Sequence, residues 1–221
     1  MTKTIKILPT VLLIFSAFLL SADVFADDQK IRDNQIWAGA EVTVPITKKR
    51  WTAEIGQQIR TEHNNNDIEY HISDFGVKYK INSILRASSS LRLKTGADEP
   101  KFVWYANIYA KYSLNDLRFT YRLRYQKKFD NTDDNEDYLR QKFTIKHKTK
   151  NILNPYLSAE LFYRFRYDKG DRFDKFRLYV GSDIKLSKRN SLKVYYLYQQ
   201  EINRSKPGIQ SIYGIFYGYD F

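Results

Sequence analysis

The chain has 221 residues, enough for one large domain or two small ones. It contains no cysteine, which excludes disulfides, thiolate metal sites and a cysteine nucleophile. Its formal net charge of +12 is typical of proteins that bind nucleic acid, anionic lipid or small acids, and its mean hydropathy of -0.58 excludes a bundle of several membrane-spanning helices.

The N-terminus has the layout of a secretory signal peptide. Lys3 and Lys6 precede an apolar run over residues 7–20, and the small residues Val24 and Ala26 precede the predicted cut. The run is too short for a stable membrane-spanning helix, although an uncleaved anchor is the alternative. We therefore predict a cleaved signal peptide over residues 1–26, a short N-terminal segment over 27–33, and an exported chain that does not meet nucleic acid.

From residue 34 onward, apolar and polar residues alternate with a period of two, which is the signature of β-strands. The predicted strands are roughly twice as long as those of a globular protein. Short connections alternate with longer polar ones, as in bacterial outer-membrane barrels. The predicted strands are 34–46, 51–62, 68–81, 85–95, 102–114, 117–128, 138–148, 156–167, 173–186, 191–202 and 209–221.

The alternation also predicts which face of each strand points outward. In 117–128, Leu117 and Tyr121 share one face, while Arg118 and Arg122 share the other. Charges follow the polar faces along their whole length, which a closed apolar core does not allow, so the apolar faces are expected to lie outside. The sequence therefore predicts an all-β fold, a transmembrane antiparallel up-and-down β-barrel over residues 34–221.

The last strand supports the same location. Tyr213, Ile215, Tyr217, Tyr219 and the terminal Phe221 share one face. This ending resembles the C-terminal signal of Gram-negative outer-membrane proteins, which the barrel assembly machinery recognises. The resemblance implies that the chain lies in the cell outer membrane, among outer-membrane lipids and lipopolysaccharide.

The number of strands is a difficulty, because eleven is odd and bacterial single-chain barrels have even counts. In 68–81, Tyr70 and Ile72 share a face but Phe75 and Val77 take the other, which marks a bulge or a misassigned strand. We expect 10 to 12 strands, with 12 favoured. Residues 27–33 then either form a short extra strand or pass through the lumen.

Several short segments resemble one family of outer-membrane proteins. They are Trp37, Arg60, Asn154-Pro155-Tyr156, Glu160-Leu161-Phe162, Phe176-Arg177-Leu178-Tyr179-Val180-Gly181 and the run from Leu192 to Gln199. They are similar to the barrel family catalogued as domain of unknown function 2490, and membership implies a location and a fold but no activity. The size and basic lumen are also similar to those of the small monomeric porins for acidic sugars.

The polar parity of the strands places many more basic than acidic residues in the lumen. Such an excess attracts anions and repels cations, and arginine grips carboxylate or phosphate with two hydrogen bonds. The sequence therefore predicts a narrow passive channel or binding barrel for small anionic solutes, with a structural or surface barrel of occluded lumen as the alternative. Arg60 and Glu160 are expected to form a structural pair. The candidates for anion contact are Arg118, Arg122, Arg124, Arg140, Arg164, Arg166 and Arg177.

A second alternative is a lipid hydrolase. His71 and Ser73 have a spacing similar to the His-x-Ser of outer-membrane phospholipase A, but the Asn-Gly that follows the serine there is absent. A serine nucleophile also needs a group that orients its histidine, and no such group can be named. The three histidines do not form a metal-binding pattern, so we expect no enzyme, no metal and no cofactor.

Overall fold

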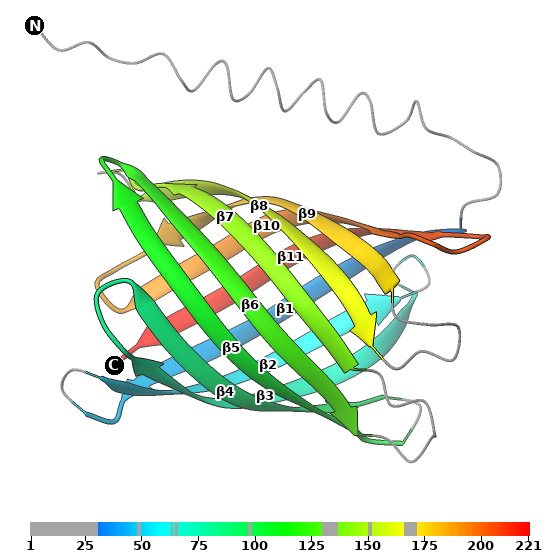
Figure 1. Cartoon of the computed structure of the whole chain (residues 1–221), viewed down its shortest axis with the longest axis horizontal. Coiled ribbons are helices and arrows are strands. Elements are labelled where there is room, and N and C mark those ends of the chain that lie inside the picture. The colour runs from blue at the N-terminus through cyan, green and yellow to red at the C-terminus, as the bar shows by residue number, and fades with distance from the viewer. Residues whose placement is uncertain are drawn as a thin grey trace, which may run out of the picture. The chain divides into compact units, whose positions relative to one another are not determined.

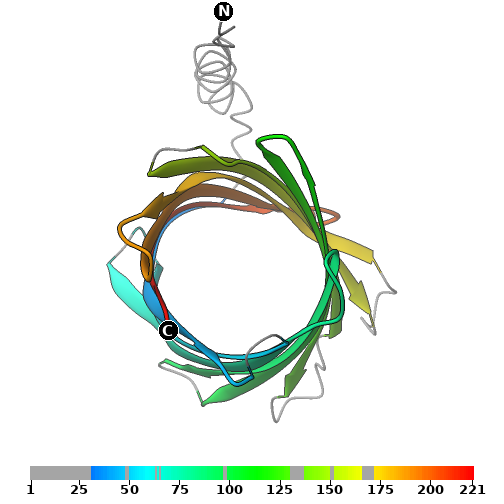
Figure 2. The same ribbon diagram turned by 90° about the vertical axis from the view of Figure 1, so that its left-hand side faces the viewer.

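The computed structural model describes residues 31–47, 50–62, 64, 66–96, 99–129, 137–149, 152–165 and 172–221. These residues form a single closed β-barrel (Figures 1 and 2). They contain no helix that is long and apolar enough to cross a membrane. The predicted signal peptide, residues 1–26, lies outside the described residues. The strands are β1 (Ile31–Pro45), β2 (Trp51–Glu62), β3 (Asp67–Lys80), β4 (Leu85–Thr95), β5 (Lys101–Leu114), β6 (Leu117–Phe129), β7 (Asp137–His147), β8 (Leu153–Phe165), β9 (Arg172–Lys185), β10 (Asn190–Glu201) and β11 (Gly208–Asp220).

The barrel closes between its first and last strands, which run parallel. Ile31 lies opposite Gly208 and Trp37 lies opposite Gly214, whereas every other pair of neighbouring strands is antiparallel. The described residues form eleven strands and not the favoured twelve, because residues 31–33 extend β1 and the parallel pairing lets an odd number of strands close. The prediction of a wholly antiparallel barrel is wrong at this one seam.

The parallel seam places the start of β1 and the end of β11 at opposite ends of the barrel (Figure 1). We call the end that carries the connections after β2, β4, β6, β8 and β10 the loop end, and the other the turn end. β1 begins at the loop end, and Phe221 lies at the turn end, where its backbone N–H donates to the Thr43 carbonyl at 3.0 Å.

A bulge lies at the start of β3, within the segment 68–81 whose pattern is irregular. Arg60 of β2 pairs with Tyr70 of β3, but the next residue, Thr61, pairs with Ile68, so Glu69 is an extra residue in β3. Beyond the bulge Ile72 is fully buried inside the barrel, whereas Phe75 is 51% exposed on its outer face. The predicted bulge in 68–81 is therefore confirmed.

The outer face of the barrel is apolar, as predicted. Large apolar side chains are exposed there on every strand except β10; in β5 they include Phe102, Trp104, Ile108 and Tyr112. The alternation of β5 places Tyr105 and Asn107 inside, where both are buried. The same alternation in each strand separates an apolar outside from a polar inside.

An apolar cluster stabilises the seam from within. Trp37, Leu197 and Ile212 of β1, β10 and β11 are buried there, and Tyr195 and Phe216 pack against them. The Tyr195 and Phe216 rings stack with centroids 6.0 Å apart. The Tyr195 ring lies directly against the backbone of Gly214 on β11. Only glycine fits at this position, because a Cβ there would lie 2.1 Å from the ring.

Candidate functional site

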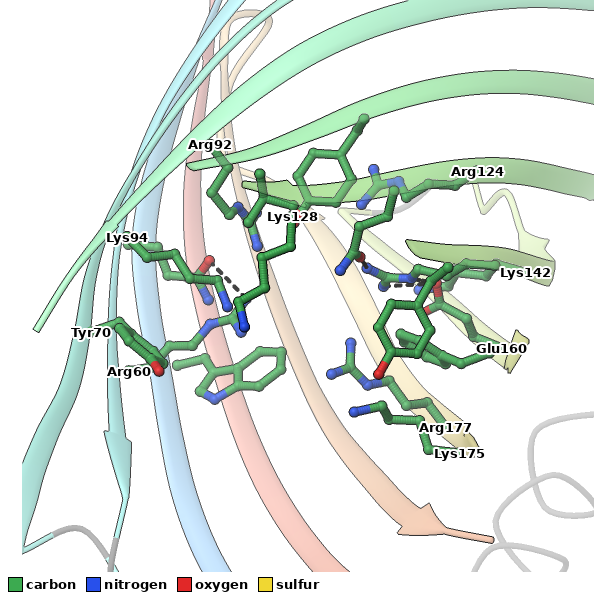
Figure 3. A pocket seen from close by; sticks show the side chains of 18 of the residues that line it. Arg60, Tyr70, Arg92, Lys94, Arg124, Lys128, Lys142, Glu160, Lys175 and Arg177 are labelled. Atoms are coloured by element: carbon green, nitrogen blue, oxygen red, sulfur yellow. Dashed lines mark hydrogen bonds and ion pairs between the residues drawn. The ribbon is translucent and has the colours of Figure 1, made fainter. Parts of the chain in front are cut away.

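A cavity of about 350 Å³ lies inside the barrel, in the half near the loop end (Figure 3). We call it the lumen cavity. Eleven lysine and arginine side chains line it, together with only two glutamates. The cations are Arg60, Arg92, Lys94, Lys101, Arg122, Arg124, Lys128, Arg140, Lys142, Lys175 and Arg177, and the acids are Glu69 and Glu160.

Strand geometry explains why so many cations meet in one place. Successive side chains of a strand point to opposite faces, so Arg122 and Arg124 of β6 both point inward. Arg140 and Lys142 of β7 do the same on the adjacent strand. Closure of the sheet then brings the side chains of β7 across the lumen from those of β1 and β2, which are distant in sequence.

Glu160 of β8 lies at the centre of the densest part of the cavity lining. Its side chain is only 2% exposed. Its Oε1 accepts from Arg122 Nη2 at 2.5 Å and from Arg140 Nη2 at 2.8 Å. Its Oε2 accepts from the Tyr179 hydroxyl at 2.9 Å. One buried carboxylate therefore holds two guanidinium groups from two different strands.

The other close ion pairs of the lumen extend from the cavity lining toward the turn end. Arg92 makes a two-bond pair with Asp74, with both contacts at 2.7 Å. Lys78 pairs with Glu54. Lys146 likewise pairs with Asp183. These pairs offset part of the positive charge of the lumen, but Arg86, Lys111 and Arg118 also face the lumen nearer the turn end, where none of the ion pairs described includes them.

Five cavity cations have no carboxylate partner in the part of the chain that the structure describes: Arg60, Lys94, Arg124, Lys142 and Arg177. The three arginines bond to neutral amides instead. Arg124 Nε donates to Asn107 Oδ1 at 2.5 Å, and Arg177 Nε donates to Gln199 Oε1 at 2.6 Å. Arg60 Nη2 has only a long contact of 3.4 Å to Gln58 Oε1. Amide partners orient these guanidinium groups but leave their charge uncompensated.

Aromatic rings hold the same cations in place. The Arg60 Cζ lies 3.7 Å from the centroid of the Trp37 ring, and the Lys142 Nζ lies 3.4 Å from that of Tyr179. Arg124 lies over Tyr105 at 4.4 Å. The negative face of an aromatic ring attracts a cation, most strongly where water is excluded. The rings therefore fix the positions of the charged groups without neutralising them.

The structure brings together four of the seven predicted contact arginines. Arg122, Arg124, Arg140 and Arg177 line the lumen cavity. Arg118 lies opposite Lys146, nearer the turn end.

Arg164 lies opposite Arg172 near the loop end, and its Cζ is 6.0 Å from the Tyr138 ring. It is buried but does not line the cavity. Arg166 lies outside the described residues.

The expected pair between Arg60 and Glu160 is not formed. Trp37 lies opposite Arg60 on the neighbouring strand β1, and the guanidinium group of Arg60 packs over the Trp37 ring. Glu160 instead forms ion pairs with Arg122 of β6 and Arg140 of β7, which lie on its side of the barrel. The pairing of lumen charges thus follows strand neighbourhood.

The sequence prediction missed several residues of the site. It placed the lysines at 94, 128 and 142 in the lumen but did not name them as contacts, and the inward aromatic residues were not considered. The sequence does contain a signal for the inward aromatic residues, because Trp37, Tyr105 and Phe162 alternate in register with the polar residues of their strands. An aromatic residue on a charged inner face marks a ring that supports a cation.

His71 and Ser73 point away from the lumen. They share the outer parity of β3 with the exposed Phe75. The Ser73 hydroxyl donates to Gln57 Oε1 at 3.0 Å, and no hydrogen bond joins it to His71. Within the described ranges, no cluster of three or more histidine, aspartate or glutamate side chains could hold a metal ion.

A charged cluster attaches the β10–β11 connection beside the cavity. Asp174 of β9 is fully buried, accepts from the Tyr138 hydroxyl at 3.2 Å, and accepts from Arg204 Nη2 at 3.1 Å. Burial acts to lower the pKa of Arg204, but the carboxylates of Glu201 and Asp174 outweigh it and raise the pKa. Arg204 therefore stays charged and holds the connection against β9.

No curated protein matches the chain at a significant level. The sequence matches the family described as "Protein of unknown function (DUF2490)" over residues 34–210. The matched region contains most of the barrel, including every cavity-lining residue except Phe216 of β11. The match covers well over half of the chain, and in this member the fold is a β-barrel. The chain therefore belongs to the DUF2490 family, whose function is unknown.

Proposed function

We propose that this protein is a Gram-negative outer-membrane barrel that binds small anionic solutes in its lumen. The membrane location is supported by the apolar outer face. Monomeric soluble proteins rarely expose contiguous apolar patches larger than roughly a few hundred square ångströms. Here the exposed apolar side chains extend over ten strands, which is typical of a surface in contact with lipid. Lipid chains and lipopolysaccharide are the natural surroundings of such a belt. The exposed Phe221 supports recognition by the barrel assembly machinery.

The lumen cavity carries the functional part of the proposal. The single decisive observation is its lining by eleven cations and two acids. Enclosed between low-dielectric walls, a single sign of charge raises the local concentration of oppositely charged solutes. Guanidinium groups add directed hydrogen bonds to carboxylate or phosphate oxygens. The cavity therefore favours small anions over neutral solutes and excludes cations.

Planar lipid bilayers test this function. Purified protein is inserted into a bilayer between two potassium chloride solutions of different concentration, and the reversal potential is measured. We expect an anion-selective potential, or, if the lumen holds its solute without passing it, saturable binding of anions to the protein in detergent. Cation selectivity, or the absence of both conductance and anion binding, would overturn the proposal.

A matched pair of variants connects the measurement to the cavity. Arg124→Gln with Lys142→Gln removes two charges that line the cavity and have no carboxylate partner. Lys188→Gln with Arg189→Gln removes two exposed charges from a connection at the turn end. We expect the first double variant to lose most of its anion selectivity or affinity and the second to retain it.

A further inference from the structure

We propose that Arg60, which lies over the Trp37 ring, and Arg177, which lies near both Trp37 and Phe162, form a subsite that takes one carboxylate or phosphate group of the solute. This subsite deepens the anion-binding function proposed above and depends on it. The bound group would occupy, between Arg60 and Arg177, a position equivalent to the one that Glu160 occupies between Arg122 and Arg140.

The Glu160 cluster shows how the lumen binds an anionic group. Its carboxylate bridges two arginines that come from neighbouring strands, with contacts of 2.5 and 2.8 Å. An aromatic ring supports this arrangement, because the Arg140 Cζ lies 4.2 Å from the centroid of Phe162. The elements of the site are therefore two guanidinium groups, one carboxylate and a supporting ring.

Arg60 and Arg177 also supply two guanidinium groups near one aromatic ring, but they have no carboxylate between them among the described residues and come from strands that are not neighbours. Their Cζ atoms lie 3.7 and 5.3 Å from the centroid of the Trp37 ring, so they are at most 9.0 Å apart, the sum of these two distances. One oxyanion that bonds two guanidinium groups keeps its central atom roughly 4 Å from each Cζ, given charge-assisted hydrogen bonds of ordinary length. One bridging group therefore needs a Cζ–Cζ spacing of about 8 Å or less. The upper bound of 9.0 Å includes such a spacing.

The hydrogen bonding of Arg60 is incomplete. Its Nε is buried and has no hydrogen-bond partner, and its Nη2 makes only the long contact to Gln58. Buried donors of a charged group are normally satisfied, because an unmade bond there costs free energy. Because protein atoms enclose the Nε, the weakly bonded Nη2 is the donor that a ligand oxygen would satisfy.

The two arginines approach the cavity from different sides. Figure 3 shows Arg60 with Lys94 on one side and Arg177 with Lys175 and Lys142 on the other. Arg60 belongs to β2 and Arg177 to β9, and β1, β11 and β10 separate them around the wall. A bound anionic group would therefore link two strands that the sheet itself does not pair.

Tryptophan fluorescence can report on this subsite, because Trp37 is one of only three tryptophans in the chain. Trp51→Phe with Trp104→Phe leaves Trp37 as the sole tryptophan emitter. The folded protein in detergent is titrated with inorganic phosphate and, separately, with acetate, at constant ionic strength. We expect a saturable change in emission, and the stronger of the two titrations identifies whether a phosphate or a carboxylate is preferred.

Two substitutions in this background test the assignment. Arg60→Gln and Arg177→Gln are each expected to weaken the preferred anion about tenfold or more, since each removes charged hydrogen bonds to it. Arg118→Gln is the matched control, because Arg118 points into the lumen but does not line the cavity. Its affinity should match that of the parent. Equal affinities in all three variants would overturn the subsite.

Folding is checked by the heat-dependent shift in gel mobility that intact barrels show. Where a glutamine variant fails to fold, Arg60→Lys or Arg177→Lys replaces it, because lysine keeps the charge but loses the two-bond geometry. A clear loss of affinity in the lysine variant supports the subsite, and an unchanged affinity overturns it.

Failure of the subsite is distinguishable from failure of the proposed function. If anions bind elsewhere in the lumen, Arg60→Gln and Arg177→Gln leave the titration unchanged while the double variant of Arg124 and Lys142 weakens it. If the lumen does not bind anions, no titration saturates and the bilayer shows no anion selectivity.

Discussion

Substitution of Glu160 by glutamine removes the one carboxylate that the structure places between two buried guanidinium groups. At an effective dielectric constant of about 20 and charge centres about 4 Å apart, each of its two ion pairs contributes about 4 kcal/mol before desolvation. Desolvation of the carboxylate offsets a large part of this gain. Removal of the carboxylate leaves the buried Arg140 and the partly buried Arg122 uncompensated, and in buried pairs such a loss costs roughly 3–5 kcal/mol.

The free energy of unfolding in detergent measures this loss, from guanidinium chloride titrations followed by tryptophan fluorescence. Glu54→Gln is the matched control, because Glu54 pairs with a single lysine and a quarter of its side chain is exposed. We expect the control to lose about 1 kcal/mol or less. Added phosphate should partly restore the stability of Glu160→Gln, since an external anion can then bind the two arginines. A Glu160→Gln variant as stable as the control would refute the assignment of a buried bridging carboxylate.

Three further outcomes are expected. Gly214→Ala should lower the free energy of unfolding by about 1–3 kcal/mol, because the new Cβ would overlap the Tyr195 ring. Gly56→Ala is the control, since its Cβ would meet nothing closer than 3.6 Å, and its free energy of unfolding should change little apart from the effect of conformational propensity. The purified protein should release no fatty acid from phospholipid vesicles, and a release that Ser73→Ala abolishes would contradict this. Deletion of Phe221 should lower the amount of folded protein in the outer-membrane fraction, and an unchanged amount of heat-shifted barrel would exclude its role in assembly.

Much of the fold could be predicted because strand alternation is a local property. The period of two identified the strands and their outward faces, and the irregular pattern of 68–81 marked the segment that contains the bulge, although the bulge itself is at Glu69 and not between Ile72 and Phe75. The closure of the barrel could not be predicted in this way. Parallel pairing of β1 with β11 depends on contacts between residues at opposite ends of the chain, such as Trp37 and Gly214, and on the space that glycine leaves for Tyr195.

The candidate site was predictable only as a set of inward charges. Parity placed Arg60, Arg140, Glu160 and Arg177 in the lumen, because side-chain direction follows from position along a strand. It did not decide which charges would meet. Pairing depends on distances across the barrel, and these depend on the order, tilt and twist of the strands.

The sequence by itself determined that the chain is a barrel with an apolar outside and a basic inside, because alternation along each strand is sufficient for that. Only the tertiary structure decided how the charge of the lumen is distributed. It paired Glu54, Asp183 and Glu160 with cations, and among the described residues it left Arg60 and Arg177 near Trp37 without a carboxylate. The physical reason is that ion pairing acts over a few ångströms, a separation set by the closed sheet and not by distance along the chain.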